Sequence, residues 1–222
     1  MLSIFDLDGT LLDSLEDLAD SSNHILGLHG YPPHPVEAYR YFVGDGIRKL
    51  VERTLPEEAR RDEVIDVIYK EFLEYYAIHM MDKTQPYAGI VALLEGLQAK
   101  GVKLAVASNK AHEAMAPLME VFFPTIRFTA VLGNKPGARP KPDPGIVLEI
   151  MRIAQEDAAT TVYAGDSGVD METAARAGLW KVGVLWGYRT KEELLAAGAD
   201  WLLPRPELAA FCRILEEVRG ER

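Results

Sequence analysis

A regular alternation of short apolar segments with helical patterns limits the possible folds of this chain more than any other feature. The segments with strand character cover residues 2–5, 102–107, 128–132, 161–164, 181–185 and 201–203. Helical patterns follow the later ones near residues 111–120, 144–155, 168–177, 190–197 and 206–219. Strands that alternate with helices of about 10–15 residues form parallel β-α-β units. We therefore predict an α/β protein with a doubly wound parallel sheet.

Residues 14–83 differ from the rest, because they contain no convincing strand. We expect a first helix capped by Ser14, a second that begins near Gly46, and a third farther along. The apolar face of the third helix comprises Ile65, Ile68, Phe72 and Tyr75. The predicted domains are therefore an α/β core of residues 1–13 and 84–222, and an all-helical insertion of residues 14–83. Ligands of open parallel sheets bind at the carboxyl ends of the strands, so the insertion is expected to lie over such a site.

The charge of the chain excludes several classes of partner. It has 24 Lys and Arg residues against 34 Asp and Glu residues, and the net charge is −10. Nucleic acids and anionic membranes attract positive surfaces, so we expect neither as a partner. Cys212 is the only cysteine, which rules out an intrachain disulfide. No targeting segment or membrane-spanning run is recognisable, so we expect a cytoplasmic protein.

Two pairs of carboxylates follow apolar segments. Asp6 and Asp8 leave the first segment and enter a glycine turn, although a solvated loop rich in turn-forming residues would contain the same types. Asp166 and Asp170 follow the 161–164 segment and open a helix, a pattern that ordinary helix capping also produces. If all four acidic groups meet at one edge of the sheet, they repel one another. A hard cation that prefers oxygen ligands would relieve that repulsion.

Groups that can bind an anion stand at two further positions. Ser108 and Asn109 come after the 102–107 segment and would offer a hydroxyl, an amide and the backbone N–H groups of a helix start, although capping alone also explains them. Lys141 lies between prolines, in Arg139-Pro140-Lys141-Pro142-Asp143-Pro144. Prolines restrict the backbone, which favours a fixed cation over a solvated surface lysine.

These motifs resemble those of a known superfamily. The segments FDLDGTLLDS, VASNK, KPDP and GDSGVDMETAARAG are similar, in this order, to the four motifs of the haloacid dehalogenase superfamily, and they extend from residue 5 to residue 178. The resemblance implies a Rossmann-like core, and the helical insertion resembles the C1 cap of that superfamily. Two further stretches, 41–53 and 186–200, are similar to segments of phosphoglycolate phosphatases.

The resemblance implies a Mg²⁺-dependent phosphatase that passes the phosphoryl group through an aspartyl-phosphate. Asp6 would be the nucleophile and Asp8 the acid and base, while Lys141, Ser108 and Asn109 would bind the phosphoryl oxygens. Mg²⁺ would be held by Asp6, the backbone carbonyl of Asp8, and Asp166, with Asp170 in support. Acid–base catalysis contributes only about 3–5 kcal/mol, far less than phosphate monoesters require, so covalent catalysis and charge stabilisation must supply the rest.

Other activities of related chemistry stay open at this point. Halide leaves without a proton, so a haloacid dehalogenase would have no use for Asp8. A β-phosphoglucomutase-like enzyme shares the fold and the cap, but the spacing of Asp166 and Asp170 looks more like that of the phosphatases. Pyrophosphatases and nucleotidases of the same superfamily are further alternatives. A phosphoacceptor signalling domain combines similar residues, but it is shorter and lacks the insertion at 14–83.

The substrate is expected to be a small phosphorylated metabolite, with 2-phosphoglycolate as the first choice. Its carboxylate needs a partner outside the phosphate site. Arg48 is the candidate, because it follows the flexible Gly44-Asp45-Gly46 loop and can bind a carboxylate through two hydrogen bonds. A solvated Arg48 paired with Asp45 or Glu52 is the alternative. We expect a monomer or a homodimer.

Overall fold

The computed structural model describes residues 1–220, and the chain divides into two compact units. The first unit comprises Met1–Leu12 and Pro86–Arg222, and the second comprises Asp13–Gln85. The boundaries expected from the sequence, after residues 13 and 83, fall within two residues of these. The role of the second unit as a cap stays a prediction.

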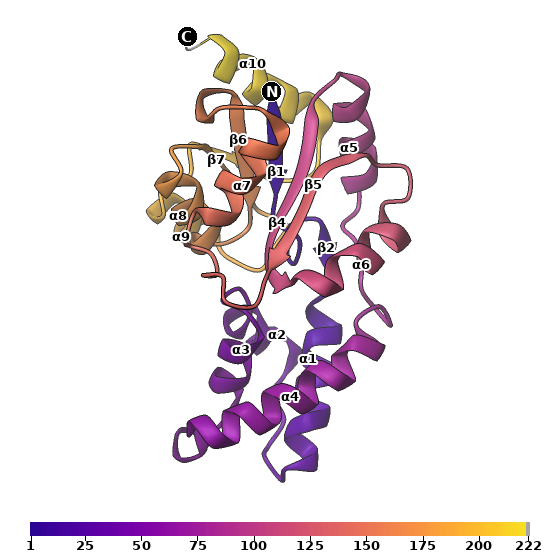
Figure 1. The fold of residues 1–222 in the computed structure, drawn as a ribbon, viewed down its shortest axis with the longest axis vertical. Coiled ribbons are helices and arrows are strands. Elements are labelled where there is room, and N and C mark those ends of the chain that lie inside the picture. Colours follow the sequence, from indigo (N-terminus) through magenta and orange to yellow (C-terminus); the bar gives the residue numbers. More distant parts are fainter. Residues whose placement is uncertain (221–222) are drawn as a thin grey trace. The chain divides into compact units, whose positions relative to one another are not determined.

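The first unit is built on a six-stranded sheet in which all paired strands are parallel. Its strands are β1 (Leu2–Phe5), β4 (Lys103–Ala111), β5 (Phe128–Asn134), β6 (Thr161–Gly165), β7 (Trp180–Val184) and β8 (Trp201–Leu203). Their order in the sheet is β5-β4-β1-β6-β7-β8. The predicted parallel α/β fold is therefore confirmed. Along the chain, β4 and β5 are added on one side of β1, and β6, β7 and β8 are then added on its other side (Figure 1).

Helices cover both faces of this sheet. They are α5 (Ile90–Ala99), α6 (Met115–Phe122), α7 (Gly145–Ala154), α8 (Gly168–Arg176), α9 (Lys191–Ala196) and α10 (Leu208–Gly220). One buried cluster joins alternate residues of β1, β4 and β5, such as Ile4 and Ala105, to α7 and α8. On the opposite face, Phe5 stacks on Phe211 of α10, with their ring centroids 5.5 Å apart. Because side chains alternate along a strand, each strand contributes to both layers.

The second unit is helical. It contains α1 (Leu15–Leu28), α2 (Val36–Phe42), α3 (Ile47–Thr54) and α4 (Asp62–His79), and a short ribbon of β2 (Leu12–Asp13) with β3 (Gln85–Pro86) contains both boundaries between the units. Buried residues from α1 and α4, such as Ile25 and Phe72, form its core. On α4 the buried tyrosine is Tyr76, whereas the predicted Tyr75 is only half-buried and stacks on His24.

Three local expectations from the sequence were wrong. Ser14 stands at the start of α1, but its hydroxyl makes no capping hydrogen bond. Helix α2 was missed, because the prolines before it indicate a break, whereas Pro35 is the residue that precedes its first turn. The helix expected near residues 111–120 begins only at Met115, because β4 continues to Ala111.

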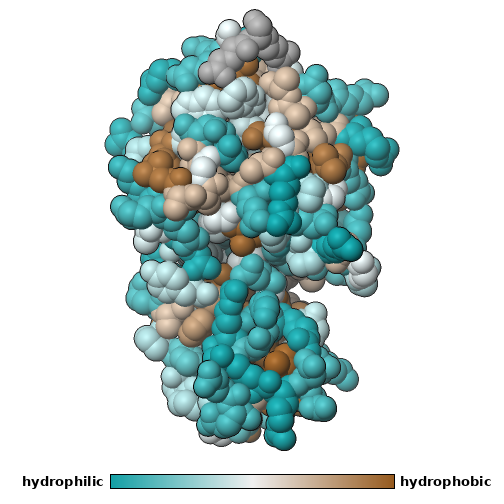
Figure 2. Space-filling model, turned by 90° about the vertical axis from the view of Figure 1, so that its left-hand side faces the viewer, coloured by the Kyte–Doolittle hydropathy of each residue, from teal (hydrophilic) through white to brown (hydrophobic). Residues whose placement is uncertain are grey.

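On the face drawn in Figure 2, hydrophilic residues predominate and apolar residues lie in small separate groups. Exposed apolar side chains that are scattered in this way are ordinary and need no partner. Among the described residues, no helix combines the length and the apolar character that crossing a membrane requires.

Candidate active site

The candidate active site lies at the carboxyl edge of the sheet, where three central neighbouring strands end. Asp6 follows β1, Ser108 lies near the end of β4, and Asp166 follows β6. The register pairs Phe5 with both Val106 and Ala164. Because parallel strands end at the same edge, this pairing brings residues that are far apart in the sequence to one place.

Lys141 joins two of the predicted carboxylates. Its ammonium nitrogen, Nζ, lies 2.8 Å from Oδ1 of Asp6 and 2.7 Å from Oδ1 of Asp170. The side chain of Lys141 is 2% exposed and that of Asp6 is 13% exposed. The expectation of a fixed cation thus agrees with the geometry. Burial would lower the pKa of Lys141, but the charges of Asp170 and Asp6 raise it well above its usual value, so the group carries a positive charge.

Tyr163, which no sequence motif indicated, completes the surroundings of Lys141. The hydroxyl of Tyr163 on β6 accepts a hydrogen bond of 2.9 Å from Lys141 Nζ and lies 3.1 Å from Oδ1 of Asp170. Lys141 Nζ also donates to the backbone carbonyl of Ala107. Four oxygen atoms therefore surround the three protons of one ammonium group, which fixes the position of the cation.

Asp170 has a second function, at the start of helix α8. Its Oδ2 accepts hydrogen bonds from the backbone N–H and the hydroxyl of Ser167, and Ser167 in turn caps the helix. The helix-capping interpretation of this segment is therefore correct, and the inclusion of Asp170 in the site stays a prediction. Since both oxygens of Asp170 are engaged by protein donors, this residue is better suited to support a metal site than to bind the metal directly.

The other buried carboxylate, Asp166, is held from two sides. Its Oδ1 accepts a hydrogen bond of 3.1 Å from the hydroxyl of Thr10, and its Oδ2 accepts one of 2.8 Å from the backbone N–H of Tyr188. The loop that carries Tyr188 can approach Asp166 only because residue 187 is glycine. A Cβ at this position would lie 2.3 Å from both the Cβ of Asp166 and the carbonyl oxygen of Gly9. The indole of Trp186 donates to the carbonyl of Thr10 and fixes the same loop.

The residues of this group fit a divalent metal. Asp6, Asp166 and Asp170 each present a carboxylate oxygen, and these atoms lie within 4.8 Å of one another. Oxygen is the ligand that hard cations such as Mg²⁺ prefer. Burial, followed by the charge of Asp170, raises the pKa of Asp166 to about 7, and burial likewise raises the pKa of Asp6. Three carboxyl groups thus share the single ammonium of Lys141, and a bound cation would favour their charged forms.

Asp8 faces Lys110, the last residue of the VASNK segment, which was not among the expected site residues. Nζ of Lys110 lies 3.1 Å from both carboxylate oxygens of Asp8. The side chain of Lys110 is 3% exposed, whereas that of Asp8 is 21% exposed. The sequence offered one indication that Lys110 is buried: it follows Asn109 directly after an apolar strand segment. The site thus has two buried cations, Lys141 beside Asp6 and Lys110 beside Asp8.

Ser108 and Asn109 are placed differently from the expectation. They belong to strand β4 and not to a helix start, so the expected N–H groups of a helix terminus are absent there. The side chain of Asn109 accepts from the backbone N–H of Lys141 at 2.7 Å and donates to its carbonyl oxygen at 3.1 Å. Asn109 therefore ties the Lys141 loop to β4. Ser108 is buried, and its Oγ accepts from the backbone N–H of Lys110.

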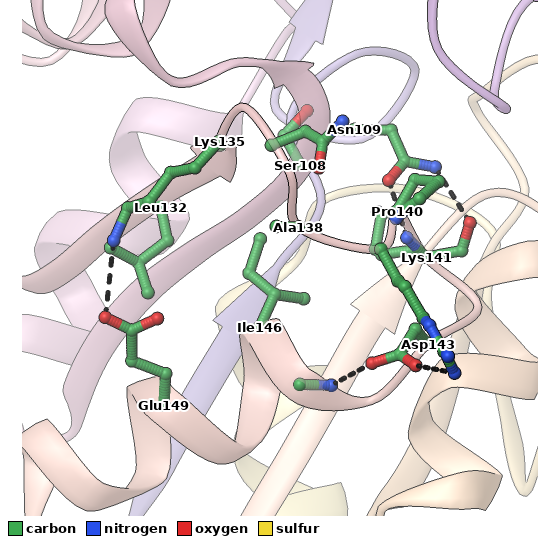
Figure 3. Close-up of a pocket in the computed structure, with 14 residues that line it drawn as sticks. Ser108, Asn109, Leu132, Lys135, Ala138, Pro140, Lys141, Asp143, Ile146 and Glu149 are labelled. Atoms are coloured by element: carbon green, nitrogen blue, oxygen red, sulfur yellow. Dashed lines mark hydrogen bonds and ion pairs between the residues drawn. The ribbon is translucent and has the colours of Figure 1, made fainter.

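A cavity of about 270 Å³ adjoins these residues. Ser108, Asn109 and Lys141 form part of its wall, and the segment from Leu132 to Glu149 forms the remainder. Figure 3 shows the amide of Asn109 turned toward the Lys141 backbone and Lys135 turned toward Glu149, 3.3 Å away. The cavity therefore belongs to the same edge of the sheet as the phosphate-binding candidates.

The remaining candidates, Gly44 and Arg48, belong to the second unit. Gly44 has a φ of +117°, in the range that favours glycine, and it precedes helix α3. Arg48 donates hydrogen bonds to Asp62 at 2.7 Å and to Asp66 at 3.0 Å, both on α4. The alternative partners named above, Asp45 and Glu52, instead bond Arg53 and Lys49. Whether Arg48 also binds a substrate stays a prediction.

Comparison with known proteins identifies the family. The model of the haloacid dehalogenase-like hydrolases matches residues 3–184. The chain belongs to this family. It is 36% identical over 187 residues to the phosphoglycolate phosphatase of Mesorhizobium japonicum, which covers 83% of this chain and 82% of that protein. It is 35% identical over 206 residues to the phosphoglycolate phosphatase of Aquifex aeolicus, which covers 91% of this chain and 92% of that protein.

Solved structures of this hydrolase family agree. A crystal structure of a protein from Lactobacillus delbrueckii has a TM-score of 0.89 at 32% identity, covering 98% of this chain and 97% of that chain. A protein from Haemophilus somnus, described as a predicted phosphoglycolate phosphatase, has a TM-score of 0.86 at 27% identity, covering 96% of each chain. The expectations of a haloacid dehalogenase fold and of an enzyme of this family are confirmed.

Proposed function

We propose that this hydrolase removes phosphate from 2-phosphoglycolate, giving glycolate and inorganic phosphate, through a phosphorylated Asp6. The observation that supports the proposal best is the setting of Asp6: its carboxylate contacts the Lys141 ammonium and shares a cluster with Asp166 and Asp170. The choice of substrate is supported by the phosphoglycolate phosphatases of Mesorhizobium japonicum and Aquifex aeolicus.

In the first step, a carboxylate oxygen of Asp6 attacks phosphorus while the bond from phosphorus to the ester oxygen breaks. Asp8 gives its proton to that ester oxygen, so glycolate leaves as a neutral alcohol at this position. Lys141 and Ser108 offer positive charge and a hydroxyl to the phosphoryl oxygens, whose charge must be stabilised as the group is transferred. Asn109 contributes by holding the Lys141 loop in place.

In the second step, water attacks the phosphorus atom of the phosphorylated Asp6. Asp8, now a carboxylate, takes a proton from this water, and the bond from phosphorus to the Asp6 oxygen breaks. Phosphate leaves, and both carboxyl groups regain their initial state. Because Asp8 alternates between acid and base, its position beside the cationic Lys110 affects both steps.

A divalent metal, which we infer to be Mg²⁺, would supply a compact positive charge that orients the phosphoryl group and neutralises its oxygens. Asp6 and Asp166 would bind it, with the backbone carbonyl of Asp8 as a further ligand and Asp170 in support. Thr10 and the backbone of Tyr188 hold Asp166 in the orientation that this requires. Partners that orient a ligand in this way commonly change metal affinity about 10- to 100-fold when they are removed.

Arg48 and the Gly44 loop are proposed, from the sequence resemblance, to contact the substrate from the helical unit. In the structure the guanidinium of Arg48 is bonded to Asp62 and Asp66. Substrate binding by Arg48 would require exchange of these exposed pairs, which contribute little free energy. The cytoplasmic location and the monomeric or homodimeric state also stay predictions.

A substrate panel tests the proposal. We expect kcat/KM for 2-phosphoglycolate to exceed that for sugar phosphates, pyrophosphate and nucleoside monophosphates at least tenfold, with Mg²⁺ present. Activity should disappear with a chelator and return with Mg²⁺. A larger kcat/KM for one of the other compounds would contradict the choice of substrate. Full activity after complete chelation would contradict the mechanism.

A further inference from the structure

Lys110 is a buried cation that the mechanism above does not fully use. Its side chain is 3% exposed, and its ammonium lies 3.1 Å from each oxygen of Asp8. Strand β4 carries it, and the backbone N–H of Lys110 bonds Ser108. The contacts with Asp8 place the ammonium on the side of the site where Asp8 lies.

This is the side on which the leaving group must lie, because Asp8 protonates the ester oxygen. In 2-phosphoglycolate a single methylene separates that oxygen from the carboxylate. A carboxylate so close to the ester oxygen must enter the surroundings of Asp8. There it would be repelled by the neighbouring cluster of Asp6, Asp166 and Asp170, in a chain whose net charge is −10.

Lys141 does not remove this repulsion, since it is bonded to Asp6 and Asp170 on the phosphate side. Lys110 is the buried cation on the side of Asp8. We propose that Lys110 determines specificity by binding the carboxylate that lies one carbon from the ester oxygen of the substrate. This inference rests on the proposed function, and it names the residue that distinguishes an anionic leaving group from a neutral one.

Two other cations serve as comparisons. Lys135 belongs to the same unit and lines the cavity beside Ser108, but its side chain is 44% exposed and pairs with Glu149. Arg48 in the helical unit is 46% exposed and is bonded to two aspartates. A carboxylate gains more from a buried, fixed cation than from an exposed one, because solvent screens the exposed charge.

The test compares 2-phosphoglycolate with phosphoglycolamide, in which an uncharged amide replaces the carboxylate. The quantity measured is the ratio of the two kcat/KM values, in wild type, Lys110→Met, Lys110→Gln, Lys135→Met and Arg48→Ala. This ratio does not depend on the fraction of folded enzyme, so a partly unfolded variant still reports it. Loss of one charged hydrogen bond predicts that the ratio falls about 10- to 100-fold in both Lys110 variants. It should stay within threefold of the wild-type ratio in Lys135→Met, whose exposed ammonium pairs with Glu149.

An unchanged ratio in the Lys110 variants would overturn the inference, since equal losses on both substrates mean that Lys110 only positions Asp8. A ratio that falls in Arg48→Ala but not in the Lys110 variants would assign the carboxylate to the helical unit instead. A wild type that hydrolyses both compounds equally well contradicts this inference alone. A wild type that hydrolyses neither contradicts the proposed function itself.

Discussion

The ammonium of Lys141 lies 2.7 Å from Oδ1 of Asp170, and the other oxygen of the same carboxylate holds the first turn of helix α8. One side chain thus connects the start of a helix to the cation beside the proposed nucleophile. The catalytic edge and the fold of the first unit are therefore stabilised by shared contacts.

This connection predicts that Lys141 stabilises the fold as well as the reaction. Replacing it with methionine leaves Asp6 and Asp170 buried without their cation, and loss of one partner of a buried pair costs about 3–5 kcal/mol. We expect Lys141→Met to lower the free energy of unfolding by that amount in urea denaturation and to abolish turnover. Lys135→Met, at an exposed pair with Glu149, is the matched control and should change stability by less than about 1 kcal/mol. Equal stabilities of the two variants would contradict the account.

In the metal-free protein the carboxylate of Asp166 should lower the free energy of unfolding, whereas Lys141 raises it. Burial, and then the charge of Asp170, raises its pKa from 3.8 to about 7. Between these values the folded state holds a proton that the unfolded state has lost, so stability falls as the pH rises through this range. We expect Asp166→Asn to be more stable than wild type at about pH 8 with a chelator, by at least ~1.4 kcal/mol, the equivalent of one pKa unit. This advantage should vanish near pH 4.

Thermal unfolding at the two pH values, with and without Mg²⁺, checks this prediction. Adding Mg²⁺ should raise the melting temperature of wild type much more than that of Asp166→Asn, because the metal relieves the repulsion only where Asp166 is present. A wild type that is more stable than Asp166→Asn at about pH 8 without metal would show that burial and the charge of Asp170 do not destabilise the Asp166 carboxylate.

Much of the core fold was predictable, because apolar strands and helical patterns alternate strongly from residue 86 onward. The acidic residues were predictable for the same reason, since each follows a strand of one parallel sheet. Local pattern was less informative in the helical insertion. On α4, Tyr75 and Tyr76 both continue the helical spacing from Phe72, and only packing determines that Tyr76 is the buried one.

The partners of the site residues could not be read from the sequence. The role of Asn109 as a phosphate ligand stays a prediction, and the sequence did not indicate that its amide bonds the backbone of a residue 32 positions away. Lys110 is adjacent to it and seemed unremarkable, because the strand was expected to end before it. Since β4 continues to Ala111, Lys110 is buried and faces Asp8. Such contacts depend on how loops from different strands meet.

Gly187 gives a prediction about metal affinity that is separate from turnover. A methyl group at this position would overlap Asp166 and the Gly9 carbonyl, so Gly187→Ala must displace Asp166 or the loop that donates to it. We expect Mg²⁺ affinity to fall about 10- to 100-fold, measured by calorimetry or by the Mg²⁺ dependence of the melting temperature. Gly27→Ala is the control, because nothing lies within 4 Å of the added carbon. Unchanged Mg²⁺ affinity in Gly187→Ala would show that the loop does not position Asp166.

The central claim is that the phosphoryl group passes through Asp6, and trapping it tests this most directly. Asp8→Asn should still react with an aryl phosphate, whose leaving group departs without a proton, but should hydrolyse the intermediate slowly. We expect acid-quenched Asp8→Asn to carry one phosphoryl group on the peptide that contains Asp6, detected by mass spectrometry. The double variant Asp6→Asn/Asp8→Asn should carry none. A phosphoryl group on another residue, or turnover by Asp6→Asn at the wild-type rate, would contradict the account.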